Sequence, residues 1–98
     1  MTDSGIEKTE NGFSITGELS FATVNRLLDA SSGVDFKDRP LFEIDLRGIT
    51  RADSAGLALL VEWTAKARLH GTNIHFRNMP GQMRAIARIT EIDKLLSL

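Results

Sequence analysis

The 98-residue sequence predicts a single α/β domain over residues 1–98, with a mixed sheet of four or five strands and three or more helices on one face. Two observations predict this fold. Strand-like and helix-like segments follow one another in the order strand, strand, helix, strand, helix, strand, helix. Almost every strand alternates apolar with polar residues, whereas a sheet covered on both faces needs strands that are apolar on both sides. We therefore expect the helices to cover one face only.

The amino-terminal part of the chain predicts a hairpin followed by a helix. Residues 6–9 and 13–16 alternate, and the Asn-Gly pair between them tolerates the positive φ angles of a hairpin turn. Ser20 is then expected to cap a helix. The buried face of this helix would carry Phe21, Val24 and Leu28. Residues 34–40 have glycine and proline neighbours and are expected to form a loop.

The central part predicts a strand, a tight turn and a long helix. Residues 41–46 alternate regularly and predict the third strand. The residues that follow are expected to turn, and a helix is expected from about Ser54 to Leu69. Gly71 can adopt the left-handed conformation that closes the last turn of this helix.

The carboxyl-terminal part predicts one more strand and one more helix. Residues 73–77 alternate, and Pro80 is placed to open a helix because its φ angle is already helical. The expected buried face of that helix comprises Met83, Ile86 and Thr90, with Ile89 beside them. Residues 92–98 are expected to form a short edge strand or a loose tail.

Composition excludes several classes of function. Twelve basic and thirteen acidic residues leave a net charge of −1, which gives no bulk electrostatic case for nucleic acid or an anionic membrane. The absence of cysteine removes disulfides, thiolate catalysis and thiolate zinc sites. The two histidines are isolated, and no glycine-rich phosphate loop occurs, so we expect no metal and no cofactor. No apolar run approaches the roughly 20 residues of a membrane span, and the amino terminus is too polar for a signal peptide, so we expect a cytoplasmic domain.

Three separated stretches carry a resemblance to a known family. They are residues 45–57 (DLRGITRADSAGL), 15–20 (ITGELS) and 89–96 (ITEIDKLL). They resemble the signature loop, the second strand with its following helix, and the closing segment of STAS domains, the fold of sulfate transporter tails and anti-sigma-factor antagonists. Within that family, the runs at 56–60, 65–66 and 71–73 are most similar to the MlaB branch, the STAS subunits of the Mla phospholipid transporter.

The resemblance to the MlaB branch implies a non-enzymatic subunit that binds the transporter's ATPase, MlaF. Such a complex maintains outer-membrane lipid asymmetry, and the subunit would be peripheral to the inner membrane only through its partner. Ser54 stands where MlaB proteins often carry threonine, whereas serine is usual in anti-sigma-factor antagonists. The antagonist branch implies a different partner, an anti-sigma factor kinase that phosphorylates Ser54.

The start of the long helix holds the main candidate site. The hydroxyl of Ser54 is expected to cap the helix. Asp53 is expected to act as a cap or dipole complement first, and only secondarily to orient the loop or to reach a basic group of a partner. A phosphate on Ser54 would gain from the helix terminus, but Asp53 and Asp45 would oppose its charge. Catalysis is not expected, because His70 would lie about 24 Å away along the helix. Gly56 is expected to permit close packing of helix on strand.

Leu59 and Trp63 are the other candidate residues on this helix. They lie four residues apart and project away from the apolar face formed by Leu57 and Leu60. Either neighbouring helices cover them, or they form an exposed patch of the kind found at interface hot spots. The helix face that MlaB-like proteins present to a partner favours the second alternative. The predicted protein-binding residues are therefore Asp53, Ser54, Ala55, Leu59 and Trp63.

Overall fold

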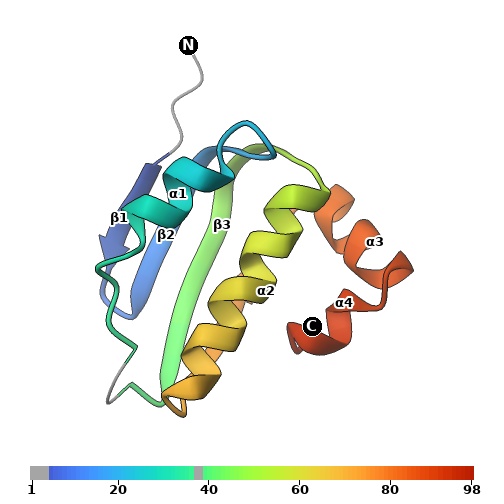
Figure 1. Ribbon diagram of the computed structural model, residues 1–98. Helices are drawn as coiled ribbons and strands as arrows, with labels where there is room; N and C mark the ends of the chain where they lie inside the picture. Colours follow the sequence, from blue (N-terminus) through green and yellow to red (C-terminus); the bar gives the residue numbers. More distant parts are fainter. Residues whose placement is uncertain (1–4, 37–38) are drawn as a thin grey trace.

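A four-stranded sheet and four helices make up the structure, a computed structural model that describes residues 5–36 and 39–98 (Figure 1). The elements in chain order are β1 (Gly5–Thr9), β2 (Gly12–Leu19), α1 (Val24–Ala30), β3 (Leu41–Ala52), α2 (Ser54–Leu69), β4 (Asn73–Arg77), α3 (Gly81–Ile89) and α4 (Ile92–Leu95). The first residues of the polar amino terminus and two residues of the predicted 34–40 loop lie outside the described residues.

The sheet is mixed, as predicted, with the strand order β1-β2-β3-β4. β1 pairs antiparallel with β2, whereas β2 with β3 and β3 with β4 are parallel pairs. Helices α1 and α2 lie over one face, and α3 and α4 pack beside α2 (Figure 1). Ser14, Asp45 and Arg77 are in register across the sheet, and none of them is buried. The alternation of the strands therefore separates a helix-covered face from a polar one.

β3 is longer than the alternation predicted, because it continues beyond Leu46 to Ala52. Residues 47–51 are mostly exposed, so the apolar signal fades there. Backbone pairing with β2 nevertheless persists, with Gly48 opposite Thr16 and Ala52 opposite Leu19. The tight turn expected before the long helix is thus reduced to Asp53 alone.

The first helix also differs from the expectation. It begins at Val24 with Thr23 as its N-cap residue, whereas Ser20 stands in a turn before it. Consequently Phe21 lies outside the helix and is 83% exposed, and Leu27 is the residue that α1 buries. The predicted core position of Phe21 is therefore wrong.

The carboxyl-terminal end forms a short helix instead of a strand or a tail. Glu91 has a positive φ of 61° and reverses the chain between α3 and α4. Leu96 then inserts into the core with 2% of its surface exposed, and the Arg68 guanidinium donates to the carbonyl oxygen of Leu95 at 2.9 Å. On α3 the buried residues are Met83 and Ala87, while Thr90 is exposed.

Leu59 and Trp63 belong to the core, and the alternative in which they form an exposed patch is wrong. Their exposed fractions are 5% and 2%. The Trp63 ring meets Phe13 edge-to-face at 5.2 Å between centroids, and its indole N–H donates to the hydroxyl of Ser31 at 2.9 Å. The physical reason is the position of α2, which α1 flanks on one side and α3 and α4 on the other (Figure 1). A central helix is covered over more than one face.

Candidate functional site

The start of α2 lies where the parallel strands β2 and β3 end. Leu19 and Ala52 form the last residue pair between these two strands, so both strands end at the same edge of the sheet. Helix α2 packs onto this edge through Gly56. A Cβ atom there would lie 2.2 Å from the carbonyl oxygen of Leu19, so only glycine fits. The predicted role of Gly56 in close packing is confirmed.

Asp53 caps α2, as expected of an aspartate before a helix, whereas the cap role predicted for Ser54 is wrong. One carboxylate oxygen of Asp53 accepts hydrogen bonds from the N–H groups of Ala55 and Gly56, at 2.9 and 3.2 Å. The other oxygen accepts from the N–H of Phe21 at 3.1 Å. A single side chain therefore satisfies two free N–H groups of the helix and also fixes the turn after β2.

The same hydrogen bonds determine the charge state of Asp53. Desolvation by burial acts to raise the pKa of its carboxyl group. The three backbone N–H groups and the positive charge of Arg51 act in the opposite direction, and the net pKa lies below its ordinary value. Asp53 is therefore ionised at neutral pH, beside the positive end of the helix dipole.

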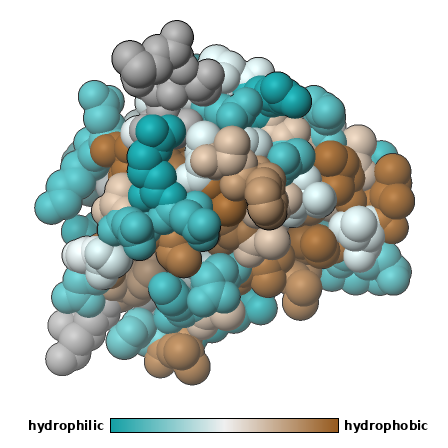
Figure 2. Space-filling view, turned by 45° about the horizontal axis from the view of Figure 1, so that its top comes forward, coloured by the Kyte–Doolittle hydropathy of each residue, from teal (hydrophilic) through white to brown (hydrophobic). Residues whose placement is uncertain are grey.

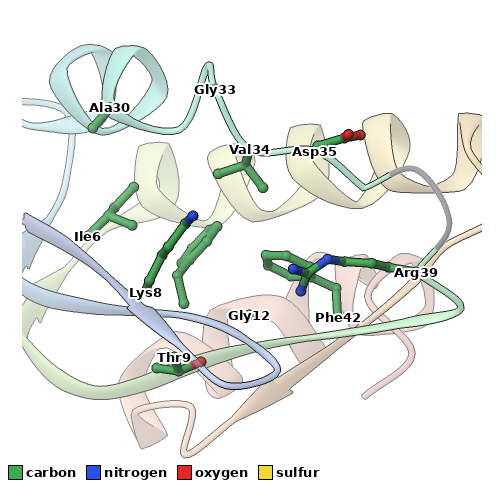
Figure 3. Close-up of a pocket in the computed structure, with 11 residues that line it drawn as sticks. Ile6, Lys8, Thr9, Gly12, Ala30, Gly33, Val34, Asp35, Arg39 and Phe42 are labelled. Carbon is green, nitrogen blue, oxygen red and sulfur yellow. The ribbon is translucent and has the colours of Figure 1, made fainter.

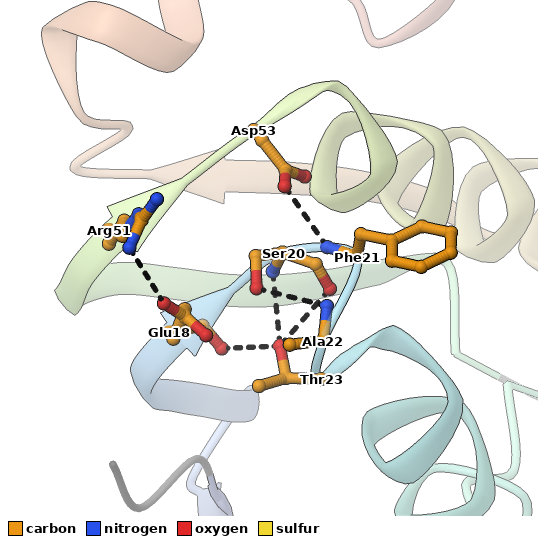
Figure 4. Close-up of polar contacts among 7 residues, drawn as sticks. All are labelled: Glu18, Ser20, Phe21, Ala22, Thr23, Arg51 and Asp53. Atoms are coloured by element: carbon orange, nitrogen blue, oxygen red, sulfur yellow. Dashed lines mark hydrogen bonds and ion pairs between the residues drawn. The ribbon is translucent and has the colours of Figure 1, made fainter.

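Hydroxyl groups hold the turn that follows β2 (Figure 4). The Ser20 N–H donates to the Thr23 hydroxyl at 3.0 Å, and that hydroxyl donates to the Glu18 carbonyl at 2.8 Å. The carboxylate of Glu18 pairs with Arg51 at 3.7 Å. Figure 4 shows the Phe21 ring pointing away from these polar groups. The turn is thus tied down on its polar side and presents an aromatic ring on its other side.

The exposed part of this junction is small, apolar and aromatic. We call it the α2-start surface and define it by Phe21, Ala22, Asp53, Ser54, Ala55 and Ala58. Four of its members are exposed, and Asp53 and Ala55 are half-buried. Figure 2 shows polar side chains mainly over the β1 side of this end of the molecule, and apolar ones toward α3.

Three of the five predicted binding residues meet on this surface, namely Asp53, Ser54 and Ala55. Leu59 and Trp63 do not reach it, because both are in the core. Phe21 also belongs to it, whereas the pattern of the sequence predicts a core position for that residue. The signal that could have found it is the pair of hydroxyl residues three apart, Ser20 and Thr23, since choosing the second as the cap leaves Phe21 outside the helix.

The environment of Ser54 is simpler than expected. It is the first residue of α2, it is exposed, and its hydroxyl makes no hydrogen bond with the described residues. Asp45 does not lie beside it, because β3 runs on to Ala52 and separates Asp45 from Asp53 by roughly 26 Å of extended chain. Of the two aspartates expected to oppose a negative charge on Ser54, Asp53 is therefore the one that lies beside it.

The described residues hold no group of three or more side chains suited to bind a metal ion. Within the same ranges, no helix is both long and apolar enough to span a bilayer. Ser54 and His70 lie at opposite ends of α2, so His70 cannot act as a base on the Ser54 hydroxyl. What the α2-start surface can provide is an apolar contact with a charged, hydrogen-bonded group beneath it.

Solved structures with similar folds include two anti-sigma-factor antagonists. The antagonist from Mycobacterium paratuberculosis superimposes with a TM-score of 0.70 at 24% identity, over 96% of this chain and 81% of that chain. The antagonist SpoIIAA in its unphosphorylated form superimposes with a TM-score of 0.66 at 16% identity, over 98% of this chain and 100% of that chain. A sulfate transporter family protein from Wolinella succinogenes superimposes with a TM-score of 0.67 at 17% identity, over 85% of this chain and 67% of that chain.

Sequence comparison identifies the family. No curated protein sequence matches the chain. A family model described as "Mlab, STAS domain" matches residues 5–97. STAS domains are generally interaction domains without enzymatic activity. The match covers every described element, including the signature loop at the start of α2, and the chain therefore belongs to the STAS domain family.

Proposed function

We propose that this protein is an MlaB-like accessory subunit that binds the ATPase of a phospholipid-transporting ABC complex, an MlaF-like protein. The observation that carries the proposal is the α2-start surface, where Phe21 is 83% exposed and its backbone N–H donates to Asp53, the residue before the exposed Ser54. The description of the matching family model supports the same branch. The protein would reside in the cytoplasm, at the inner membrane only through this partner, and support lipid asymmetry of the outer membrane.

The shape and chemistry of this surface suit a permanent contact. Ala22, Ser54 and Ala58 have short side chains, so the backbone of a partner can approach the first turns of α2 closely. Phe21 supplies the large apolar area that interface anchors provide. Asp53 holds the turn and the helix together, so both halves of the surface are arranged before binding. The ATPase would receive a rigid platform that stabilises its productive arrangement.

The test is co-purification with the transporter's ATPase subunit. Phe21→Ala and Ser54→Phe are each expected to weaken binding by at least tenfold, the first by removing an anchor and the second by a steric clash. Neither change should reduce stability much, because both side chains are exposed. Ile89→Ala is the matched control, since Ile89 on α3 is also 83% exposed.

Two results would separate the surface from the function. If both variants bind the ATPase as tightly as the unaltered protein, the α2-start surface is wrongly assigned. If the unaltered protein does not bind the ATPase at all, the MlaB-like function itself is wrong.

A second candidate is an anti-sigma-factor antagonist that an anti-sigma factor kinase switches by phosphorylating Ser54. The exposed hydroxyl of Ser54 at the first position of α2 favours it, because a kinase can reach that group. Against it, Asp53 already occupies the N–H groups of Ala55 and Gly56 that a phosphate would use. Intact mass of the natively expressed protein, before and after phosphatase treatment, distinguishes the two. Stoichiometric phosphate on Ser54 would favour the switch.

A further inference from the structure

A second exposed surface adjoins the start of α2. β4 pairs with β3 only as far as Asp45, which is opposite Arg77. Residues 47–52, which we call the β3 extension, therefore have a strand partner on the β2 side alone. Gly48 is exposed, and because glycine has no side chain, solvent reaches the backbone there. The β3 extension ends directly before Asp53, so it continues the α2-start surface.

The charged residues of the β3 extension are all positive. Arg47 and Arg51 are exposed, and no acidic residue occurs between positions 47 and 52. The side chain of Arg51 is 78% exposed, whereas that of Glu18, which pairs with it at 3.7 Å, is 16% exposed (Figure 4). The side chain of Arg47 makes no hydrogen bond or ion pair with the described residues. The cations of this surface are thus more accessible than the carboxylate beside them.

The two aspartates that flank the β3 extension are engaged within the molecule. Asp45 accepts hydrogen bonds from the side-chain amide of Asn78 and from the N–H of Arg47, both at 2.9 Å. Asp53 accepts from three backbone N–H groups, and both aspartates are half-buried. A guanidinium group carries five N–H donors, so both arginines keep donors for another molecule.

Other arginines of the protein are held by their own surroundings. The guanidinium of Arg39 lies 5.6 Å from the ring centroid of Phe42, beside the hollow between β1 and the start of β3 (Figure 3). Arg68 donates to the carbonyl oxygen of Leu95, and Arg77 pairs with Glu43 at 3.5 Å. Arg47 and Arg51 differ because they lie within about 13 Å of each other along one exposed strand.

Protection of a free edge explains only part of this arrangement. Charged side chains and β-bulges on an unpaired edge discourage pairing between copies of a protein. The β3 extension has both, since β3 advances by three residues from Asp45 to Gly48 while β2 advances by two from Ser14 to Thr16. That role requires charge but no particular sign, and bulges also re-aim side chains beside binding sites. The uniformly positive charge next to the α2-start surface is the observation that points to a partner.

We propose that the β3 extension binds an acidic segment of the same ATPase, with carboxylates against Arg47 and Arg51, while Phe21 and Ser54 meet a less polar part of it. This inference rests on the proposed function, because it names the chemistry of the partner at that surface. Arginine forms charge-assisted and often bidentate hydrogen bonds with carboxylates. Exposed charges at the rim of an interface act mainly on the association rate, and salt weakens their effect.

The test measures association and dissociation rates between the purified ATPase and the 98-residue chain at about 50 and 300 mM salt. Arg47→Gln and Arg51→Gln are each expected to slow association about three- to tenfold at low salt, and less at high salt. Lys66→Gln is the charge-matched control, since Lys66 is exposed in the last turn of α2, away from this surface. Phe21→Ala should instead speed dissociation and leave the salt dependence unchanged.

The outcomes separate this inference from the function on which it rests. If the ATPase binds the unaltered protein and both arginine variants at equal rates, the acidic contact is wrong while the MlaB-like function stands. The same conclusion follows if Lys66→Gln slows association as much as Arg51→Gln does. If the protein alone forms a salt-sensitive dimer that Arg51→Gln dissociates, the occupant is a second copy and the proposal is overturned. If the unaltered protein does not bind the ATPase at all, the inference and the proposed function are both wrong.

Discussion

Asp53 links two parts of the site because three backbone N–H groups converge on its carboxylate, two from α2 and one from the turn after β2. Few single residues could replace it. Asparagine would keep one cap oxygen but lose the charge that the helix terminus favours and the second oxygen, which accepts from the Phe21 N–H. The lowered pKa of Asp53 is the measurable sign of this arrangement.

Acid should weaken the protein through Asp53. Its pKa is lowered in the folded state relative to the ordinary value of 3.8, so its ionised form contributes stability above that pH. The contribution is lost as the pH falls through the lower, folded-state pKa. Asp53→Asn should cost about 0.3–1 kcal/mol of unfolding free energy at pH 7, and this difference from the unaltered protein should shrink toward pH 2. Urea unfolding across this pH range measures it, and a constant difference would contradict the assignment.

Gly56 allows a second test at the level of single residues, of the close contact between α2 and the Leu19 carbonyl. Gly56→Ala should lower the free energy of unfolding by about 1–3 kcal/mol, because the new methyl group would overlap the Leu19 carbonyl. The effect runs against helix propensity, which favours alanine over glycine. Gly81→Ala in α3 is the control, since a Cβ there meets no atom within 4 Å. Equal effects of both changes in urea unfolding would contradict the predicted overlap.

Single residues differ in how far the sequence could predict them. The close approach at Gly56 was predictable, since glycine at the start of a helix after a strand has few other uses. The sequence offers both Asp53 and Ser54 as caps and cannot choose between them, because both residue types cap helices and the end of β3 carries little apolar signal. Phe21 was assigned to the core because its hydrophobicity says nothing about which of two hydroxyl residues starts α1.

Among the elements, α1 and α2 are joined by a buried hydrogen bond. The indole N–H of Trp63 donates to the hydroxyl of Ser31, which in turn donates to the Leu28 carbonyl at the end of α1. These two hydrogen bonds connect the middle of α2 to the C-terminal end of α1. The sequence could not predict it, because helical periodicity describes one helix at a time and does not say which neighbour covers its flank.

Removing this connection should destabilise the protein. Ser31→Ala leaves the buried indole N–H without a partner and is expected to cost about 1–3 kcal/mol of unfolding free energy. The exposed neighbour Ser32 provides the control, since Ser32→Ala should change little. The chain has one tryptophan, so its fluorescence reports unfolding and the altered indole environment together. Equal stability of the two variants would show that the Trp63 contact is dispensable.

At the scale of the whole molecule, the order of strands and helices along the chain was the most predictable feature. Alternation located four strands and their polar sides, and the mixed sheet with helices on one face followed from it. The length of β3 was not predictable, because its second half is held by backbone pairing with β2 instead of by buried side chains. The short helix α4 could not be predicted either, since its packing depends mainly on Leu96 and on the hydrogen bond from the Arg68 guanidinium.

The sheet topology predicts how the molecule opens. β3 pairs with strands on both sides, and Ile44 and Leu46 within it have no exposed surface. β1 pairs only with β2, and three of its five residues are exposed. Hydrogen exchange should therefore find the bonded amides of β3 exchanging only through global unfolding, with the full dependence on urea. Bonded amides of β1 should exchange faster and depend less on urea. Equal exchange free energies for both strands would mean that β1 opens only when the whole sheet does.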